Sequence, residues 1–348
     1  MPISAIDAIS PAFQHTRQQL FQPFKIGQWL KLALVGLLAG ELTTGSCGNF
    51  NTNLQAPRHP NHFLAPSLPK MDPLLLALLI AVLLVLGFLF WIFFLYLNSV
   101  MRFILFDSVV EKDCEIRRGW IQRQWPGLRY FLWQILFGSA TFAGMTIVLG
   151  IPAAFALAAG WLTKPKEHVA PLILLGIVVF LVLMALVVVS AVVHVLTKDF
   201  VIPQMAVEDL SAFQAWGRLL PMLGSEKGSY LAYVLMKIVM ALGVGIVVGI
   251  ITTIVILVTL IPIGDLGALF VFAGKAAGLG WNLYTITVAV VAGCAVLAAI
   301  FYVVSVVSVP AMVFFPAYSI YFFASRYPAL DALIHPTPPL PQPMSPAS

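Results

Sequence analysis

The amino-acid sequence predicts an all-α fold, a polytopic membrane helix bundle of about six transmembrane helices arranged as three hairpins with interfacial amphipathic helices. Of its 348 residues, 61% are hydrophobic and only 9% are charged, and the mean hydropathy is +0.98. Soluble domains are on average about half apolar, so a water-soluble core could not bury this much apolar surface. Several apolar runs also reach the roughly 20 helical residues that cross a hydrocarbon layer of about 30 Å.

The apolar runs locate the individual spans. The first is short, because its strictly apolar part ends before Glu41. The last apolar stretch is too long for one span, and Pro310 and Pro316 interrupt it, so we expect a spanning helix to about Val309 followed by a kinked or interfacial segment. The predicted spans lie near residues 29–45, 73–101, 130–160, 170–196, 230–261 and 284–309.

The segments outside these spans complete a single membrane domain, residues 28–326. We expect a cytoplasmic interfacial helix before it and a disordered proline-rich tail after it. Asn, Pro and small residues predict an irregular outer loop between the first two spans. These parts are the helix at 1–27, the outer loop at 46–72, the cytoplasmic connectors at 102–129 and 197–229, and the tail at 327–348.

The orientation follows from the basic residues. With the N-terminus inside, most Lys and Arg residues fall on the cytoplasmic side. The segment Ser4–Phe21 mixes charged residues and glutamines, unlike a cleavable signal peptide, so we expect the first span to stay as an anchor. The sequence therefore predicts a multi-pass protein of the bacterial cytoplasmic (inner) membrane with both termini in the cytoplasm.

An internal repeat supports the three-hairpin layout. The stretch "FILFDSVVEKD" from Phe103 aligns with "FVIPQMAVEDL" from Phe200, and "VFFPAYSIYFF" from Val313 is a weaker third copy. The period is near 100 residues. We interpret it as an interfacial helix followed by a transmembrane hairpin, although chance similarity among apolar sequences would also produce such sparse matches.

Charge and aromatic residues concentrate in the two connectors. Tryptophan is typical of the headgroup level of a membrane, and each basic group near the surface gains about 1 kcal/mol from anionic lipid. The simplest interpretation is a solvated connector that lies on the membrane; the functional one is a docking surface for anionic headgroups or a partner. The predicted lipid or partner surface comprises Arg117, Arg118, Trp120, Arg123, Trp125, Arg129, Trp216 and Arg218.

Two ionisable residues are candidates for polar groups inside the membrane. Placing such a group near the bilayer centre costs about 2.5 to 3.5 kcal/mol, so it often marks function. Glu41 either reaches the outer interface or is shielded by a close neighbour along the Gly36 and Gly40 stripe. His194 ends the fourth span and either meets headgroups or relays protons. Lys237 can extend its ammonium to the inner interface.

The sequence names no reaction. It has no HExxH or GxSxG motif and no phosphate-binding glycine loop. His59, His62 and His168 could meet on the outer side, but nothing in their loops indicates a fixed ligand set. We predict no catalytic residues, no metal site, no cofactor and no nucleic-acid partner.

The stretch "RFILFDSVVEKD", the segment Trp120–Arg129 and the later "DFVIPQMAVED" resemble an uncharacterised family of prokaryotic multi-spanning membrane proteins. That family is remotely similar to the membrane domain fused to some glycerophosphodiester phosphodiesterases. The resemblance implies a membrane module over most of residues 5–325. The phosphodiesterase activity is not implied, because this chain has no room for the soluble barrel that carries it.

Three functions remain open from the sequence. The favoured one is a non-enzymatic integral membrane protein, a lipid-interacting or membrane-complex assembly module, with a homo-oligomer or another membrane protein as further partner. The alternative is a small-solute or lipid transporter that uses Glu41 and His194 as intramembrane polar groups. Against it, the middles of spans two to four are almost wholly apolar. A membrane-embedded enzyme is least favoured.

Overall fold

The computed structural model describes residues 3–41, 73–276, 278 and 283–335. Every regular element within these ranges is a helix and none is a strand, so the predicted all-α class is confirmed. The helices are α1 (Ile9–Phe21), α2 (Ile26–Leu38), α4 (Pro73–Val110), α5 (Ile116–Ala158), α6 (Val169–Leu196), the π-helical turn η1 (Thr197–Val201), α7 (Ile202–Glu208), α8 (Ala212–Ser225), α9 (Lys227–Ala276), α10 (Leu283–Ala324) and α11 (Pro328–Ile334).

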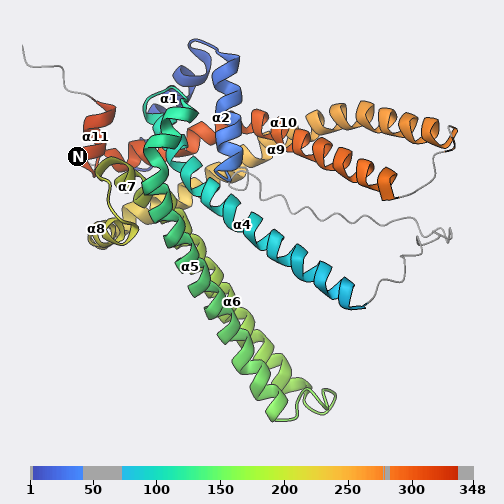
Figure 1. Ribbon diagram of the computed structural model, residues 1–348. Helices are drawn as coiled ribbons and strands as arrows, with labels where there is room; N and C mark the ends of the chain where they lie inside the picture. Colours follow the sequence, from blue (N-terminus) through green and yellow to red (C-terminus); the bar gives the residue numbers. More distant parts are fainter. Residues whose placement is uncertain (1–2, 42–72, 277, 279–282, 336–348) are drawn as a thin grey trace, which may run out of the picture.

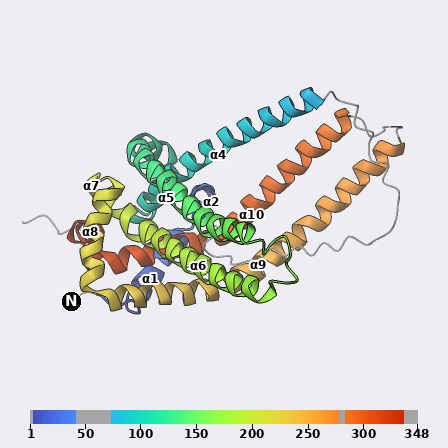
Figure 2. The same cartoon turned by 90° about the horizontal axis from the view of Figure 1, so that it is seen from below.

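The helices form a packed core from which long apolar arms extend (Figure 1). One arm is the first part of α4, a second is α5 beside α6, and a third consists of α9 and α10, which run out together and diverge (Figures 1 and 2). Five helices are long and apolar enough to cross a membrane, and their most apolar stretches are 0% to 6% buried. Apolar surface of this extent needs an apolar solvent, so the structure is consistent with a membrane protein.

The first predicted span, 29–45, is shorter than expected. Helix α2 has 13 residues. At about 1.5 Å per residue it is roughly 20 Å long and does not cross a layer of about 30 Å. The six spans in three hairpins are therefore not confirmed. Helix α4 packs against α5 near the core, while its outer part runs alone (Figure 1). The predicted outer loop at 46–72 lies outside the described residues.

The first connector, predicted at 102–129, is corrected by the structure. Helix α4 continues to Val110 and α5 begins at Ile116, so only five residues separate them. The end of α4 is not a solvated surface segment, because Phe103 and Ile104 are 0% and 1% exposed. They belong to the main hydrophobic cluster, to which residues of α1, α2, α9 and α10 also contribute. Phe103 and Phe106 of this segment therefore belong to the core, whereas Trp125 stays exposed.

The second connector, 197–229, folds as η1, α7 and α8. The first two elements are buried, with Phe200 and Met205 both 0% exposed. Helix α8 is amphipathic, as expected, and a capping box at Ser211 with Gln214 starts it. The expected interfacial helix at 1–27 contains α1, whose Ala8 and Ala12 face the core.

The C-terminal part also differs from the prediction. Helix α10 does not stop near Val309 but runs through both prolines to Ala324. Its last turns are held by packing, since Val313 and Phe322 are fully buried. The predicted disordered tail from 327 begins too early, because α11 follows and Leu330 is 0% exposed. Residues 336–348 lie outside the described part of the chain, and the internal repeat stays a prediction.

Candidate functional site

A cluster of buried charged residues lies in the core, between the end of α2, the later part of α4, the turn η1 and the first part of α9. Its centre is η1, in which Lys198 and Asp199 are consecutive. A π-helical turn inserts an extra residue and is frequent at functional sites. Asp199 is 2% exposed, and Arg102 on α4 is 9% exposed. Charged residues this deeply buried require partners.

The first ion pair joins Lys198 to Glu41, which are 157 positions apart in the sequence. Glu41 is held in place by the end of α2, where Gly40 takes a left-handed φ of +73°. The Glu41 amide donates to the Gly36 carbonyl at 3.0 Å, which is the Schellman arrangement that ends many helices. Asn98 of α4 donates to the Leu38 carbonyl at 3.0 Å and fixes the same end.

The second ion pair joins Asp199 to Lys237 near the start of α9. The Tyr233 hydroxyl also donates to Asp199, at 3.0 Å, and the Lys237 ammonium lies 5.9 Å from the centre of the Tyr233 ring. The two charged side chains retain 3% and 7% of their exposure. The expectation that Lys237 extends to the inner interface is therefore wrong: α9 points it into the core, where a carboxylate receives it.

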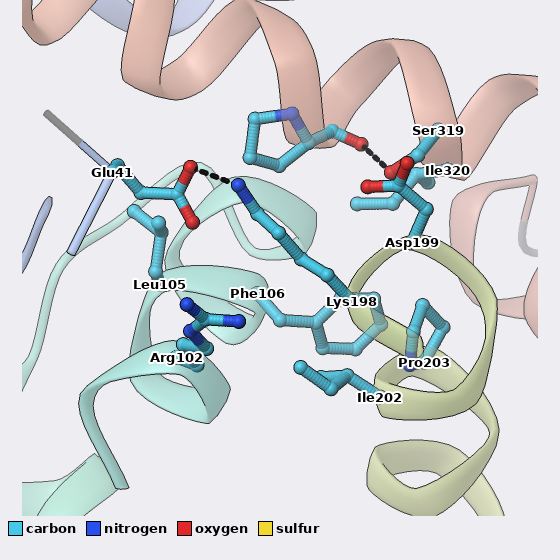
Figure 3. A pocket seen from close by; sticks show the side chains of 11 residues that line it. Glu41, Arg102, Leu105, Phe106, Lys198, Asp199, Ile202, Pro203, Ser319 and Ile320 are labelled. Atoms are coloured by element: carbon cyan, nitrogen blue, oxygen red, sulfur yellow. Dashed lines mark hydrogen bonds and ion pairs between the residues drawn. The ribbon is translucent and has the colours of Figure 1, made fainter. Parts of the chain in front are cut away.

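Arg102 completes the cluster. Its Nε donates to the Ala39 carbonyl at 3.2 Å and its Nη1 to the Tyr130 hydroxyl at 3.0 Å. Figure 3 shows the Arg102 and Lys198 side chains converging on Glu41. A cavity of about 30 Å³ lies among them, with room for about two water molecules. Tyr130 is 1% exposed and accepts this hydrogen bond inside the core.

The two predicted intramembrane residues are not brought together. Glu41 is 6% exposed and lies on the cavity, so the shielded alternative is the one that the structure adopts. A close neighbour of the glycine stripe is Met312, whose Sδ would stand 2.3 Å from a Cβ at Gly36. His194 is exposed on α6, one turn before Lys198, and does not line the cavity.

A separate buried histidine fastens α1 to the core. His15 Nε2 lies 2.7 Å from the Val109 carbonyl oxygen and Nδ1 lies 3.2 Å from the Tyr321 hydroxyl. The neutral ring that donates from Nε2 and accepts at Nδ1 satisfies both contacts. Burial lowers the pKa of His15 below its ordinary value of 6.5, because the charged form would lose its hydration.

The predicted lipid or partner surface divides into exposed and engaged residues. Arg117 and Arg118 are exposed, and in the described part of the chain neither forms a hydrogen bond or an ion pair. Trp125 is 73% exposed. Trp120 is half-buried and packs edge-on against Tyr96. The first three residues are free to meet a membrane surface.

The remaining arginines of that surface hold the protein together. Arg123 forms a two-pronged contact with Asp107, with Nε at 2.6 Å and Nη2 at 2.7 Å from the carboxylate oxygens. Its Nη1 also donates to the Ala206 carbonyl at 2.8 Å. Arg123 therefore joins α4, α5 and α7 and is engaged inside the protein. Arg129 donates to the Asp209 carbonyl at 2.6 Å while its side chain stays 47% exposed.

Helix α8 contributes the last two predicted residues. Trp216 is half-buried, with its ring centre 6.3 Å from that of Trp133 on α5. Phe213, on the same side of α8, is 63% exposed and packs edge-on against Trp133. Arg218 is paired with Glu208. Phe213 and Trp216 of α8 thus lie against Trp133 of α5, and the place of these rings in a membrane stays a prediction.

Sequence reasoning missed most of the buried cluster. Arg102 was counted as a surface charge, and Lys198 and Asp199 as part of a connector. A basic residue inside a span, Lys237, was the available signal, since such a group needs a carboxylate partner. The partner itself could not be identified, because it lies on another helix.

One protein family matches nearly the whole chain. A family of unknown function, DUF7544, matches residues 3–333, which include the buried cluster and the exposed arginines. The chain belongs to this family. The prediction of an uncharacterised family is confirmed, while the similarity to the membrane domain of glycerophosphodiester phosphodiesterases is not shown and stays a prediction. No curated protein and no solved structure matches.

In the described residues no group of three or more His, Cys, Asp or Glu side chains is placed to hold a metal. His59 and His62 lie outside the described residues.

Proposed function

We propose that the protein is a non-enzymatic integral membrane module of the bacterial cytoplasmic membrane that binds anionic lipid headgroups at its inner surface. One observation carries this proposal. On α5 the exposed Arg118 and Trp125 share a face with Leu132, which is 57% exposed and belongs to the apolar arm. The chain thus passes from basic to aromatic to apolar along one exposed helix face, which is the order of a membrane interface.

The charge on this face should change the lipid affinity by a measurable amount. Two exposed arginines near an anionic surface contribute about 2 kcal/mol together, which is roughly 30-fold in lipid affinity. The effect falls with salt, because the Debye length at physiological ionic strength is about 8 Å. The α5 face therefore supports preferential binding of anionic over zwitterionic lipid.

The direct test compares two double variants in nanodiscs of mixed phosphatidylglycerol and phosphatidylcholine. We expect Arg117→Gln with Arg118→Gln to lose bound phosphatidylglycerol, counted by native mass spectrometry. The matched control is Lys164→Gln with Lys166→Gln, which removes two exposed cations between α5 and α6 at the far end of the arm. Equal lipid loss in the two double variants would contradict the proposed surface.

The proposed orientation places the core and both termini on the cytoplasmic side. It is supported by the return of α6 and α10 to the core from which α5 and α9 leave (Figure 1). The exposed apolar arms would also fit a second copy or another membrane protein. A change in oligomeric state between detergent and nanodiscs would reveal that assembly role.

Transport is the second candidate, and the position of Glu41 on a cavity that charged side chains also line favours it. The exposed position of His194 outside that cavity speaks against the predicted pair. If Glu41 takes part in transport, Glu41→Gln alters solute flux or proton coupling in vesicles. Unchanged flux in a folded variant removes this function.

A further inference from the structure

The buried cluster contains more positive than negative side chains. Arg102, Lys198 and Lys237 are cations, and Glu41 and Asp199 are the carboxylates that face them. If all five are ionised, one positive charge is left over.

None of the other acidic residues that the structure describes balances this charge. The chain has 14 Asp and Glu residues, and in the described part of the chain no other carboxylate lies within ion-pair distance of these three cations.

Arg102 is the cation without a carboxylate of its own. Its hydrogen bonds go to neutral oxygens, the Ala39 carbonyl and the Tyr130 hydroxyl. These use two of the five donors of a guanidinium. Glu41 attracts Arg102 only from beyond ion-pair distance and is itself paired with Lys198. A buried cation without a direct carboxylate contact is costly, because burial removes its hydration.

The cavity of about 30 Å³ lies beside this guanidinium. Its charged lining consists of the cations Arg102 and Lys198 and the carboxylates Glu41 and Asp199. Each carboxylate is already paired with a lysine, so the guanidinium of Arg102 is the charge left to attract a further group, and the apolar walls formed by residues such as Leu105 and Phe106 strengthen that attraction. Figure 3 shows both cationic side chains directed toward the same space. We propose that this cavity binds one singly charged anionic group, which neutralises the cluster.

Two sources share this chemistry. A halide ion is compact and singly charged, and the phosphodiester of a lipid headgroup also carries one negative charge. Arginine matches either, and its planar fork suits the oxygen pair of a phosphodiester. Lys198 keeps 10% of its side-chain exposure, so the cluster is not sealed from its surroundings. This site differs from the exposed α5 face and does not depend on the lipid binding proposed there.

The test is a charge series at the cluster. Arg102→Gln and, independently, Lys198→Gln bring its net charge to zero, whereas Asp199→Asn raises it to two. Each variant and the wild type are purified in maltoside detergent. Thermal unfolding is followed in sodium bromide against sodium gluconate at equal ionic strength, and chloride binding is read separately from NMR line broadening.

We expect bromide to stabilise the wild type. Both neutral variants should lose at least about tenfold in anion affinity, the factor that corresponds to one charge-assisted hydrogen bond, and Asp199→Asn should gain affinity. If Arg102→Gln does not fold, Lys198→Gln and Asp199→Asn still decide the matter. Short-chain phosphatidylglycerol is the second ligand: stabilisation by it alone identifies a lipid source, and by bromide alone a free ion.

No anion response in the wild type, or the same response throughout the series, overturns the proposal. Arg117→Gln with Arg118→Gln should keep the bromide response, which separates this site from the surface on α5.

Discussion

Replacing Asp199 with asparagine removes the carboxylate that holds Lys237 in the core. The pair is almost free of solvent, with 3% and 7% of side-chain exposure, so water does not screen the stranded ammonium. Breaking a buried ion pair by removing one partner typically costs about 3 to 5 kcal/mol. The Tyr233 hydroxyl that now donates to Asp199 can donate to the asparagine oxygen, so the lost term is mainly the charge.

A double-mutant cycle isolates that term. Lys237→Met keeps the apolar stem and removes the charge, and the double variant has no stranded ammonium. We expect Asp199→Asn to lower the unfolding midpoint in detergent by about 6 to 10 °C, from roughly 2 °C per kcal/mol in a large domain. Addition of Lys237→Met should restore most of it. A loss below about 1 kcal/mol, or no recovery in the double variant, would refute the buried pair.

Three further outcomes test the core. Arg123→Ala should lower the free energy of unfolding by about 2 to 3 kcal/mol in chemical denaturation, because the Asp107 carboxylate loses both of its charged hydrogen bonds. A change within about 0.5 kcal/mol, as at an ordinary surface site, would contradict this role. When the pH falls from 7.5 to 5.5, the free energy of unfolding should decrease by up to about 1.4 kcal/mol, because the lowered pKa of His15 means that only the unfolded chain takes up a proton in this range. His15→Gln should make the unfolding midpoint less dependent on pH. An unchanged dependence would assign the effect to another group. Gly40→Ala should lower the free energy of unfolding by at least about 1 kcal/mol, because Gly40 has a left-handed φ of +73°. The control is Gly27→Ala, whose added methyl group would meet nothing within 4 Å, and it should be neutral or stabilising in thermal unfolding. Equal effects of the two substitutions would contradict the backbone bend before Glu41.

Apolar arms were the most predictable part of the fold. Helix α6 begins and ends within one residue of the predicted span 170–196, because a long uninterrupted apolar run permits little else. The spans on α5 and α9 were predicted with later starts, at 130 and 230, where the apolar runs begin. Composition marks the lipid-exposed part of a helix and does not mark where the same helix continues into a protein core.

The sequence could not predict which residues of the same chain pack or pair with one another. Residues 102–110 are rich in charge and aromatic side chains, which suits an interface as well as a core; packing by helices far along the chain decided for the core. Glu41 was recognised as unusual, but its lysine lies 157 positions away. The sequence alone does not show which of several cations such a carboxylate will meet. Neither of the two buried ion pairs was therefore predicted.

The central claim is that the packed core lies on one side of the membrane, the cytoplasmic side. Cysteine accessibility tests this claim most directly. In a cysteine-free variant, single cysteines replace Arg118 on α5, Arg218 on α8 and Lys164 between α5 and α6. Intact and inverted membrane vesicles are treated with a membrane-impermeant thiol reagent. We expect positions 118 and 218 to react from the cytoplasmic side and position 164 from the opposite side. Reaction of 118 and 218 from opposite sides, or of 164 from the same side as both, would contradict the claim.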